Sequence, residues 1–167
     1  MLVLGAALTV LHSAAIPAPV LHRDAPGEWR ALHILADDCD CSKSVADRLA
    51  SRGRLPNWRE DVIVIGRDPV DDTSLTTTGF TVQHLTADDA ARAGFQGAPW
   101  LVLRDPAGRV VYSGGYTAAR PAPGQPTQET KIMQSVRGGQ TVNPLPAFGC
   151  ATSQNLRRQL DPLHLAY

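Results

Sequence analysis

Two cysteines separated by a single residue, Cys39 and Cys41, are the side chains of this sequence best suited to chemistry. They follow a short apolar segment and precede a segment whose apolar residues recur with helical spacing. A thiol at the N-terminus of a helix ionises more easily, because backbone amides and the helix dipole stabilise its thiolate. We therefore expect Cys39 to act as the catalytic nucleophile and Cys41 to resolve the disulfide that Cys39 forms.

Negative charge beside the pair opposes this effect. Asp37, Asp38 and Asp40 flank the two cysteines, and a nearby carboxylate raises the pKa of a thiol. A disulfide between cysteines one residue apart also closes a tighter ring than one across two residues, and strain makes a disulfide easier to reduce. A Cys39–Cys41 disulfide would therefore favour oxidation or isomerisation of a substrate.

A third cysteine, Cys150, lies much later in the chain, in the segment NPLPAFGCATS. If this segment folds back, Cys150 could resolve Cys39 as a disulfide or complete a cluster of three thiolates. Such a cluster could also hold a soft metal, copper or zinc, with His33 or His84 as a fourth ligand. A metal carrier that uses Cys39, Cys41 and Cys150 is thus the alternative to a thiol–disulfide oxidoreductase, which needs no cofactor.

In a third interpretation the cysteines form a purely structural disulfide.

The patterns around these cysteines predict a domain of alternating strands and helices. Short apolar runs predict strands at residues 29–35, 61–67 and 79–86. Helical spacing of apolar residues predicts helices at residues 42–53, 87–95 and 128–139. Residues 97–116 predict a hairpin around the turn Asp-Pro-Ala-Gly. This order indicates an α/β fold with a mixed sheet and helices on both of its faces.

The N-terminal stretch differs in composition from the rest of the chain. It is apolar from Leu2 to Leu11 and then becomes rich in proline, which is typical of an export signal followed by a linker. We expect a signal peptide or membrane tether at residues 1–15, a linker at 16–28, a folded domain at 29–150 and a C-terminal tail at 151–167. Export would place the cysteines in an oxidising compartment, the periplasm, with the domain either released or anchored to the membrane and facing the periplasm.

The net charge and the length of the chain narrow the possible functions. The chain has 16 basic and 16 acidic residues, so it has no excess of positive charge that would attract nucleic acid. With 167 residues, it can bury an ordinary core without help from disulfides. Function therefore accounts for the cysteines better than stability does.

The order of elements resembles the thioredoxin fold over residues 29–137, on the strength of Cys39, Cys41, Ala98 and Pro99. The resemblance implies a thioredoxin-like three-layer α/β/α domain with a central mixed sheet. It also implies that the Ala98–Pro99 bond is cis and that Pro99 faces the cysteines, shapes the substrate groove and keeps other ligands away from the thiols. The partners implied are protein thiols or disulfides and a redox partner protein.

A narrower resemblance is to the RedB-like group of exported bacterial thioredoxin-like proteins. Four motifs occur in the order of that group, namely Cys39-Asp40-Cys41-Ser42, Ser113-Gly114-Gly115 with Arg120, Gly138-Gly139, and Phe148-Gly149-Cys150. The chain departs from the group in having Asp40 where proline is expected and in its loop after Arg120, PAPGQPTQE. The resemblance implies a redox site and a location outside the cytoplasm, but no particular substrate.

Overall fold

The computed structural model describes residues 27–66, 72–120 and 126–160. The expected signal or tether at 1–15, all but the end of the linker at 16–28, and the last residues of the tail lie outside these ranges. Within them, no helix is both long enough and apolar enough to cross a membrane.

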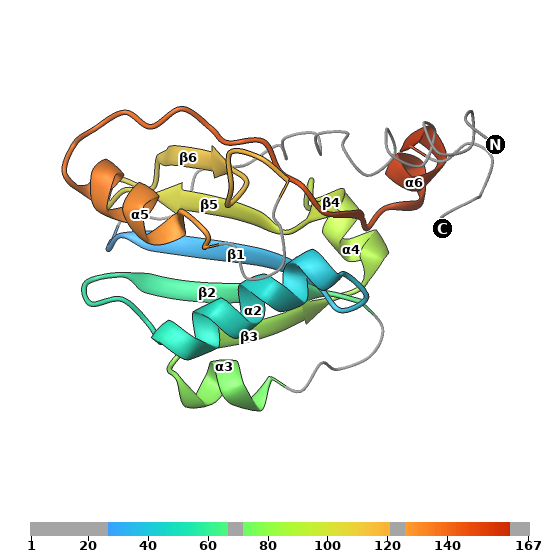
Figure 1. Ribbon diagram of the computed structural model, residues 1–167, viewed down its shortest axis with the longest axis horizontal. Coiled ribbons are helices and arrows are strands. Elements are labelled where there is room, and N and C mark those ends of the chain that lie inside the picture. Colours follow the sequence, from blue (N-terminus) through green and yellow to red (C-terminus); the bar gives the residue numbers. More distant parts are fainter. Residues whose placement is uncertain (1–26, 67–71, 121–125, 161–167) are drawn as a thin grey trace.

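A five-stranded sheet forms the centre of the domain, in the order β3-β2-β1-β5-β6 (Figure 1). Its strands are β1 Arg30–Ala36, β2 Arg59–Ile65, β3 Thr81–Leu85, β5 Trp100–Arg104 and β6 Val110–Gly114. Strands β1, β2 and β3 run parallel, whereas β5 is antiparallel to both β1 and β6. The sheet is therefore mixed, as the sequence predicts.

Helices cover both faces of this sheet. Their bounds are α2 Asp40–Arg52, α3 Thr73–Thr77, α4 Ala87–Arg92, α5 Glu129–Arg137 and α6 Gln154–Leu160. Helices α2 and α5 lie side by side over one face, where Leu49 and Met133 are fully buried (Figure 1). On the other face Ala90 of α4 and Leu156 of α6 join a second core. The expected thioredoxin-like three-layer α/β/α architecture is confirmed.

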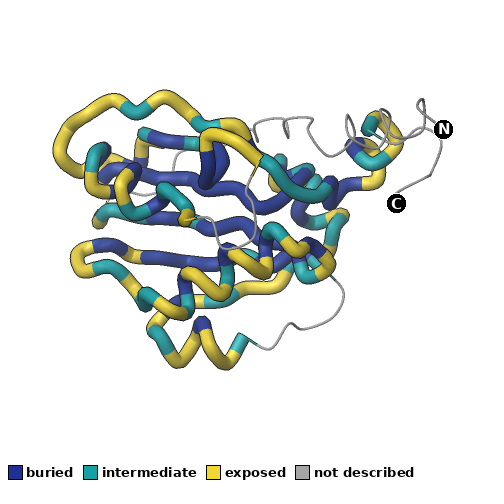
Figure 2. Tube along the Cα trace, viewed as in Figure 1, coloured by how far each residue is buried: buried dark blue, intermediate teal, exposed yellow. Residues whose placement is uncertain are grey.

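The central strand β1 shows why its sequence is apolar throughout. Alternate side chains of a strand point to opposite faces. Ala31 and Leu35 therefore belong to the core under α2 and α5, and Ile34 and Ala36 belong to the core under α4 and α6. Strands β1, β2 and β5 form the buried centre, whereas the edge strand β3 and the outer sides of the helices and loops carry exposed residues (Figure 2).

Three features extend beyond the sequence prediction, and the first is the short helix α3. A second, two-stranded sheet pairs β4, Gly97–Ala98, with β7, Cys150–Ala151. After β7 the chain continues into α6, whose Leu156 is buried, so that residues 151–160 belong to the folded domain and not to a separate tail. Strands of two residues and a helix of seven carry too little periodicity to be recognised in the sequence.

Candidate active site

Cys39 lies where β1 gives way to α2. It is the residue before the first turn of the helix, and its carbonyl accepts the first helical hydrogen bond from the Lys43 amide at 3.0 Å. Ser42 fixes the connection, because its buried Oγ accepts a hydrogen bond from the Ala36 amide at 3.0 Å. The Cys39 side chain is fully buried, with its Sγ 3.7 Å from the Ala98 carbonyl oxygen. The helix N-terminus expected for the cysteines is therefore present.

Pro99 directly follows Ala98, the residue whose carbonyl contacts this sulfur. The peptide bond between Ala98 and Pro99 is cis, as the resemblance to the thioredoxin fold implies. Strand β4 ends at Ala98 and β5 begins at Trp100, so the proline turn links the small sheet to the large one. This turn brings the Ala98 carbonyl against Cys39.

Cys150 also lies close to Cys39 and Ala98, because the segment that carries Cys150 folds back onto the domain. In the β4–β7 pair, Cys150 lies directly opposite Ala98. The preceding residue must be glycine, since a β-carbon at Gly149 would lie 2.0 Å from the Ala98 carbonyl oxygen and 2.5 Å from Cδ of Pro99. Cys150 is thus held against the strand end whose carbonyl contacts Cys39.

The motif Ser113-Gly114-Gly115 holds the beginning of the same returning segment. The Gly115 amide donates to the Leu145 carbonyl at 2.8 Å, and a β-carbon on Gly115 would lie 2.0 Å from the Pro146 carbonyl oxygen. The Tyr112 hydroxyl reinforces this contact by donating to the Gly115 carbonyl at 2.6 Å. Glycines in two separate motifs therefore serve one purpose, the close packing of residues 145–150 on the domain.

The three thiols interact with one another, and none is in a disulfide. Hydrogen bonds from the thiols of Cys150 and Cys41 lower the pKa of Cys39 far below its ordinary value, although burial by itself would raise it. Ser42 adds two further hydrogen bonds that also lower the pKa of Cys39. These hydrogen bonds favour ionisation of Cys39 over ionisation of the other two thiols.

The two donor thiols respond in the opposite direction. Their hydrogen bonds to Cys39, followed by burial, raise the pKa of both Cys41 and Cys150. Asp40 raises the pKa of Cys41 further, while the positive charge of Arg120 opposes this, and Asp38 raises the pKa of Cys150. Of the aspartates expected to hinder ionisation, Asp40 and Asp38 thus act on the two donor thiols, which favours ionisation of Cys39.

The three cysteine residues differ in their exposure to solvent. Cys39 is fully buried, whereas Cys41 and Cys150 are partly exposed. A molecule in solution therefore meets Cys41 or Cys150 before it meets Cys39. The spacing of the cysteines gave no sign of this difference, because it depends on the returning segment that carries Cys150.

The histidines considered as metal ligands do not join the thiols. His33 points to the opposite face of the sheet, where it lies 2.9 Å from the Tyr116 hydroxyl and 3.1 Å from a carboxylate oxygen of Glu60. His84 lies on the edge strand β3 and pairs with Asp72. Among the described residues, no group of three or more His, Cys, Asp or Glu side chains is arranged to hold a metal ion. The metal-carrier alternative gains no support.

A buried polar network beneath α2 was not foreseen from the sequence. Glu60 is 1% exposed and accepts hydrogen bonds from two nitrogens of Arg52, at 3.1 and 2.6 Å, besides its contact with His33. Arg52 also reaches Glu129, another buried carboxylate, at 3.4 Å. The network ties the end of α2 to strand β2 and helix α5. The acidic start of β2 gave the only sequence signal of it.

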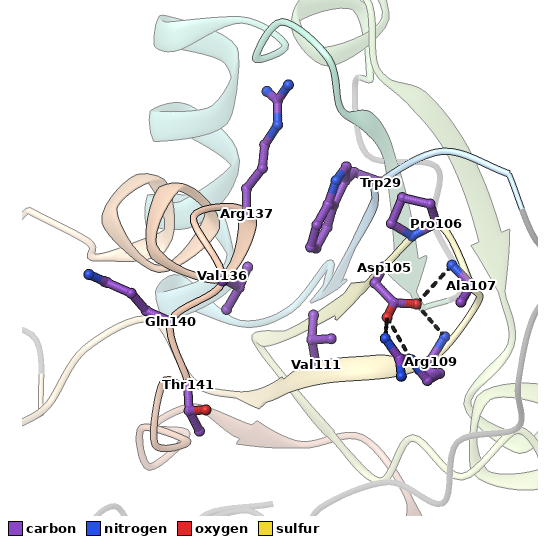
Figure 3. A pocket seen from close by; sticks show the side chains of 11 residues that line it. Trp29, Asp105, Pro106, Ala107, Arg109, Val111, Val136, Arg137, Gln140 and Thr141 are labelled. Carbon is purple, nitrogen blue, oxygen red and sulfur yellow. Dashed lines mark hydrogen bonds and ion pairs between the residues drawn. The ribbon is translucent and has the colours of Figure 1, made fainter.

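A separate hollow of about 630 Å³ lies at the other end of β5, lined among others by Trp29, Asp105 and Val136 (Figure 3). Asp105 is occupied within its own turn, accepting hydrogen bonds from the Ala107 and Arg109 amides at 2.9 Å. No cysteine is among the described residues that line this hollow. The thiol cluster remains the candidate active site.

No protein-family model matches this chain, and no curated protein matches it either. Among solved structures, it is similar to an uncharacterised conserved protein from Geobacillus kaustophilus, with a TM-score of 0.58 and 16% identity over 84% of this chain and 90% of that chain. A candidate thioredoxin from Neisseria meningitidis gives a TM-score of 0.48 and 18% identity over 76% of this chain and 88% of that chain. The thioredoxin domain of a thiol-disulfide oxidoreductase from Bacteroides vulgatus gives a TM-score of 0.38 and 11% identity over 58% of this chain and 85% of that chain. At these identities the likeness concerns the fold.

Proposed function

We propose that this protein is a thiol–disulfide oxidoreductase that works outside the cytoplasm on protein thiols or disulfides. The observation that carries the proposal is the Cys39 sulfur at the start of α2, which accepts hydrogen bonds from two other thiols. A thiolate of low pKa is a good leaving group in disulfide exchange, and its stability in the reduced state makes the disulfide a stronger oxidant. The direction proposed is therefore the oxidation or isomerisation of substrates.

The exchange begins with the protein in its Cys39–Cys41 disulfide form. A substrate thiolate attacks the partly exposed Cys41 sulfur, and Cys39 leaves as the stabilised thiolate. The second substrate thiol then loses its proton to water and attacks the substrate sulfur of this mixed disulfide. Cys41 leaves as a thiolate and takes up a proton from water. The substrate loses two electrons and gains a disulfide, while the protein gains two electrons and holds two reduced cysteines. A redox partner protein restores the disulfide.

This order assigns the attack site differently from the expectation that Cys39 itself meets the substrate. The reason is the complete burial of Cys39, compared with the partial exposure of Cys41. Pro99 keeps its expected role of shaping the groove, because the turn at this residue lies against the Cys39 sulfur. The RedB-like pattern supports a periplasmic site of action, either released or tethered through the N-terminus.

The proposal is tested by measuring the oxidation of a dithiol peptide by the oxidised protein. Cys39→Ala should abolish turnover and Cys41→Ala should lower it strongly, whereas Ser44→Ala, an exposed substitution on the same helix, should leave it unchanged. Intact mass and peptide mapping should locate the disulfide at Cys39 and Cys41.

Metal analysis of the reduced protein under anaerobic conditions tests the metal-carrier alternative. Stoichiometric copper or zinc that is lost in Cys150→Ser would replace the redox function with the metal carrier.

A further inference from the structure

Cys150 forms no covalent bond in the exchange described so far, yet three features of the fold converge on its position. The β4–β7 pair sets it opposite Ala98, whose carbonyl contacts the Cys39 sulfur. Gly149 brings its backbone against Pro99, and Gly115 lets residues 145–147 pack closely on the end of β6. A cysteine without a role would not need two close backbone contacts to hold it beside another sulfur.

The burial of the three sulfurs gives a second reason. Cys39 contacts both neighbours but has no exposed surface, while each neighbour is partly exposed. A disulfide made by Cys39 with either neighbour therefore joins one partly exposed residue to one fully buried residue. The site has two exposed thiols that share one buried partner.

We propose that Cys150 is a third redox thiol, which forms a disulfide with Cys39 in alternation with Cys41. The inference rests on the proposed function and adds to it a second exchangeable disulfide. Cys39 becomes the shared sulfur of the site. Cys41 and Cys150 become two separate positions at which a substrate and a redox partner meet the protein.

The internal step balances without any further reactant. The Cys150 sulfur, as a thiolate, attacks the Cys39 sulfur of the Cys39–Cys41 disulfide. A Cys39–Cys150 bond forms, the Cys39–Cys41 bond breaks, and Cys41 leaves as a thiolate that takes up the proton Cys150 gave up. The number of electrons on the protein does not change. The same step in reverse returns the disulfide to Cys41, so an oxidant that acts at Cys150 can supply a substrate that reacts at Cys41.

A test uses the reduced Cys41→Ser protein and less than one equivalent of 2,2′-dithiodipyridine, a small disulfide that releases a coloured thiopyridone. Attack by Cys150 releases one thiopyridone and leaves a mixed disulfide. Attack by the Cys39 thiolate on the Cys150 sulfur then releases the second. The expected result is two thiopyridones for each reagent molecule, loss of two hydrogen atoms from the protein mass, and a Cys39–Cys150 cross-link in the peptide map. Cys39→Ser, which lacks the shared sulfur, should retain the reagent as an adduct.

The variant Cys150→Ser separates this inference from the proposed function. It should form the Cys39–Cys41 disulfide with the same reagent. If it does so while Cys41→Ser retains a lasting adduct, the third redox thiol is refuted and the proposed function stands. If Cys150→Ser also retains an adduct, both are refuted. Partial oxidation of the unmodified protein, quenched in acid, needs no variant to fold and should give both disulfides in the peptide map; a map with Cys39–Cys41 alone counts against the inference.

Discussion

Gly149 packs directly on Ala98, so closely that a β-carbon on Gly149 would lie 2.0 Å from the Ala98 carbonyl oxygen. The contact joins the residue before Cys150 to the residue before the cis-proline. It therefore sets the position of the third thiol relative to Cys39, whose sulfur contacts the same carbonyl oxygen.

We predict that Gly149→Ala moves Cys150 away from Cys39. The added methyl group meets backbone, which cannot turn aside as a flexible side chain can, and overpacking of this kind costs about 1–3 kcal/mol. The Cys39–Cys150 disulfide should form more slowly in the Cys41→Ser background, while the Cys39–Cys41 disulfide of the single variant still forms. Gly27→Ala, at a position with open space around it, is the control and should change neither the melting temperature nor the disulfides. Unchanged cross-linking in Gly149→Ala would show that Gly149 does not position Cys150.

The thiolate on Cys39 should be visible in the pH dependence of the reduced protein. Because hydrogen bonds from Cys150 and Cys41 lower the pKa of Cys39, absorbance of the thiolate near 240 nm should persist into acidic solution, far below the ordinary cysteine pKa of about 8.5. Removing the larger contribution with Cys150→Ala should move the midpoint to higher pH. Cys41→Ala should move it less. A midpoint that stays in place in both variants would contradict the hydrogen-bonded cluster.

Much of the fold followed from local sequence patterns. The runs WRALHIL and DVIVIGR became β1 and β2, because strands covered on both faces are apolar throughout. The Gly-Ala-Pro turn carried enough resemblance to predict a cis bond at Pro99, and the structure has one. The strand DVIVIGR begins two residues earlier than expected, at Arg59, because Arg59 and Glu60 pair with β1 despite their charge.

What could not be predicted depends on contacts between distant segments. Whether Cys150 joins Cys39 depends on the return of residues 145–150, which is set by backbone packing at Gly115 and Gly149. Cys39 also shares its core with Ala147 and Ala151, which belong to or directly follow this segment. His33 could be placed on one of two faces by strand alternation, but its partner Glu60 is separated from it by 27 residues. Sequence periodicity contains no information on pairs of this kind.

Glu60 makes the folded protein sensitive to acid. Burial would raise its pKa, but hydrogen bonds from His33 and Arg52 outweigh burial and lower the pKa to about 2. This is below the value of about 4.3 for an unfolded chain, so the stabilisation is fully present above that pH and is lost as the pH falls towards 2. A shift of this size contributes about 3 kcal/mol to the free energy of unfolding.

Urea unfolding between pH 6 and pH 2 measures this contribution. We predict that Glu60→Gln has a lower free energy of unfolding than the unmodified protein at neutral pH. Its free energy of unfolding should also fall less steeply as the pH is lowered. The thiol cluster lies across the sheet, so disulfide formation by Cys39 and Cys41 should not change in the folded variant. An equally steep loss of stability in Glu60→Gln and in the unmodified protein would assign the acid sensitivity to other carboxylates.

The last prediction concerns the ion pair between Arg157 of α6 and Asp38, whose charged atoms lie 3.3 Å apart beside Cys150. Asp38 raises the pKa of Cys150, so Asp38→Asn should lower that pKa and speed alkylation of Cys150 by iodoacetamide at neutral pH. Arg157→Gln keeps donors for the Ala151 carbonyl but leaves the Asp38 charge uncompensated, so it should slow the same reaction.

The two substitutions break one ion pair and are expected to act in opposite directions. An exposed pair contributes only about 0.2–1 kcal/mol, so each rate should change by a few-fold at most and the melting temperature should hardly move. Peptide mass mapping after short exposure to iodoacetamide gives the rate at Cys150 separately from that at Cys41. Faster alkylation in both variants would instead mean that the pair holds α6 in place over Cys150. In that case physical cover, and not the charge of Asp38, controls access to the third thiol.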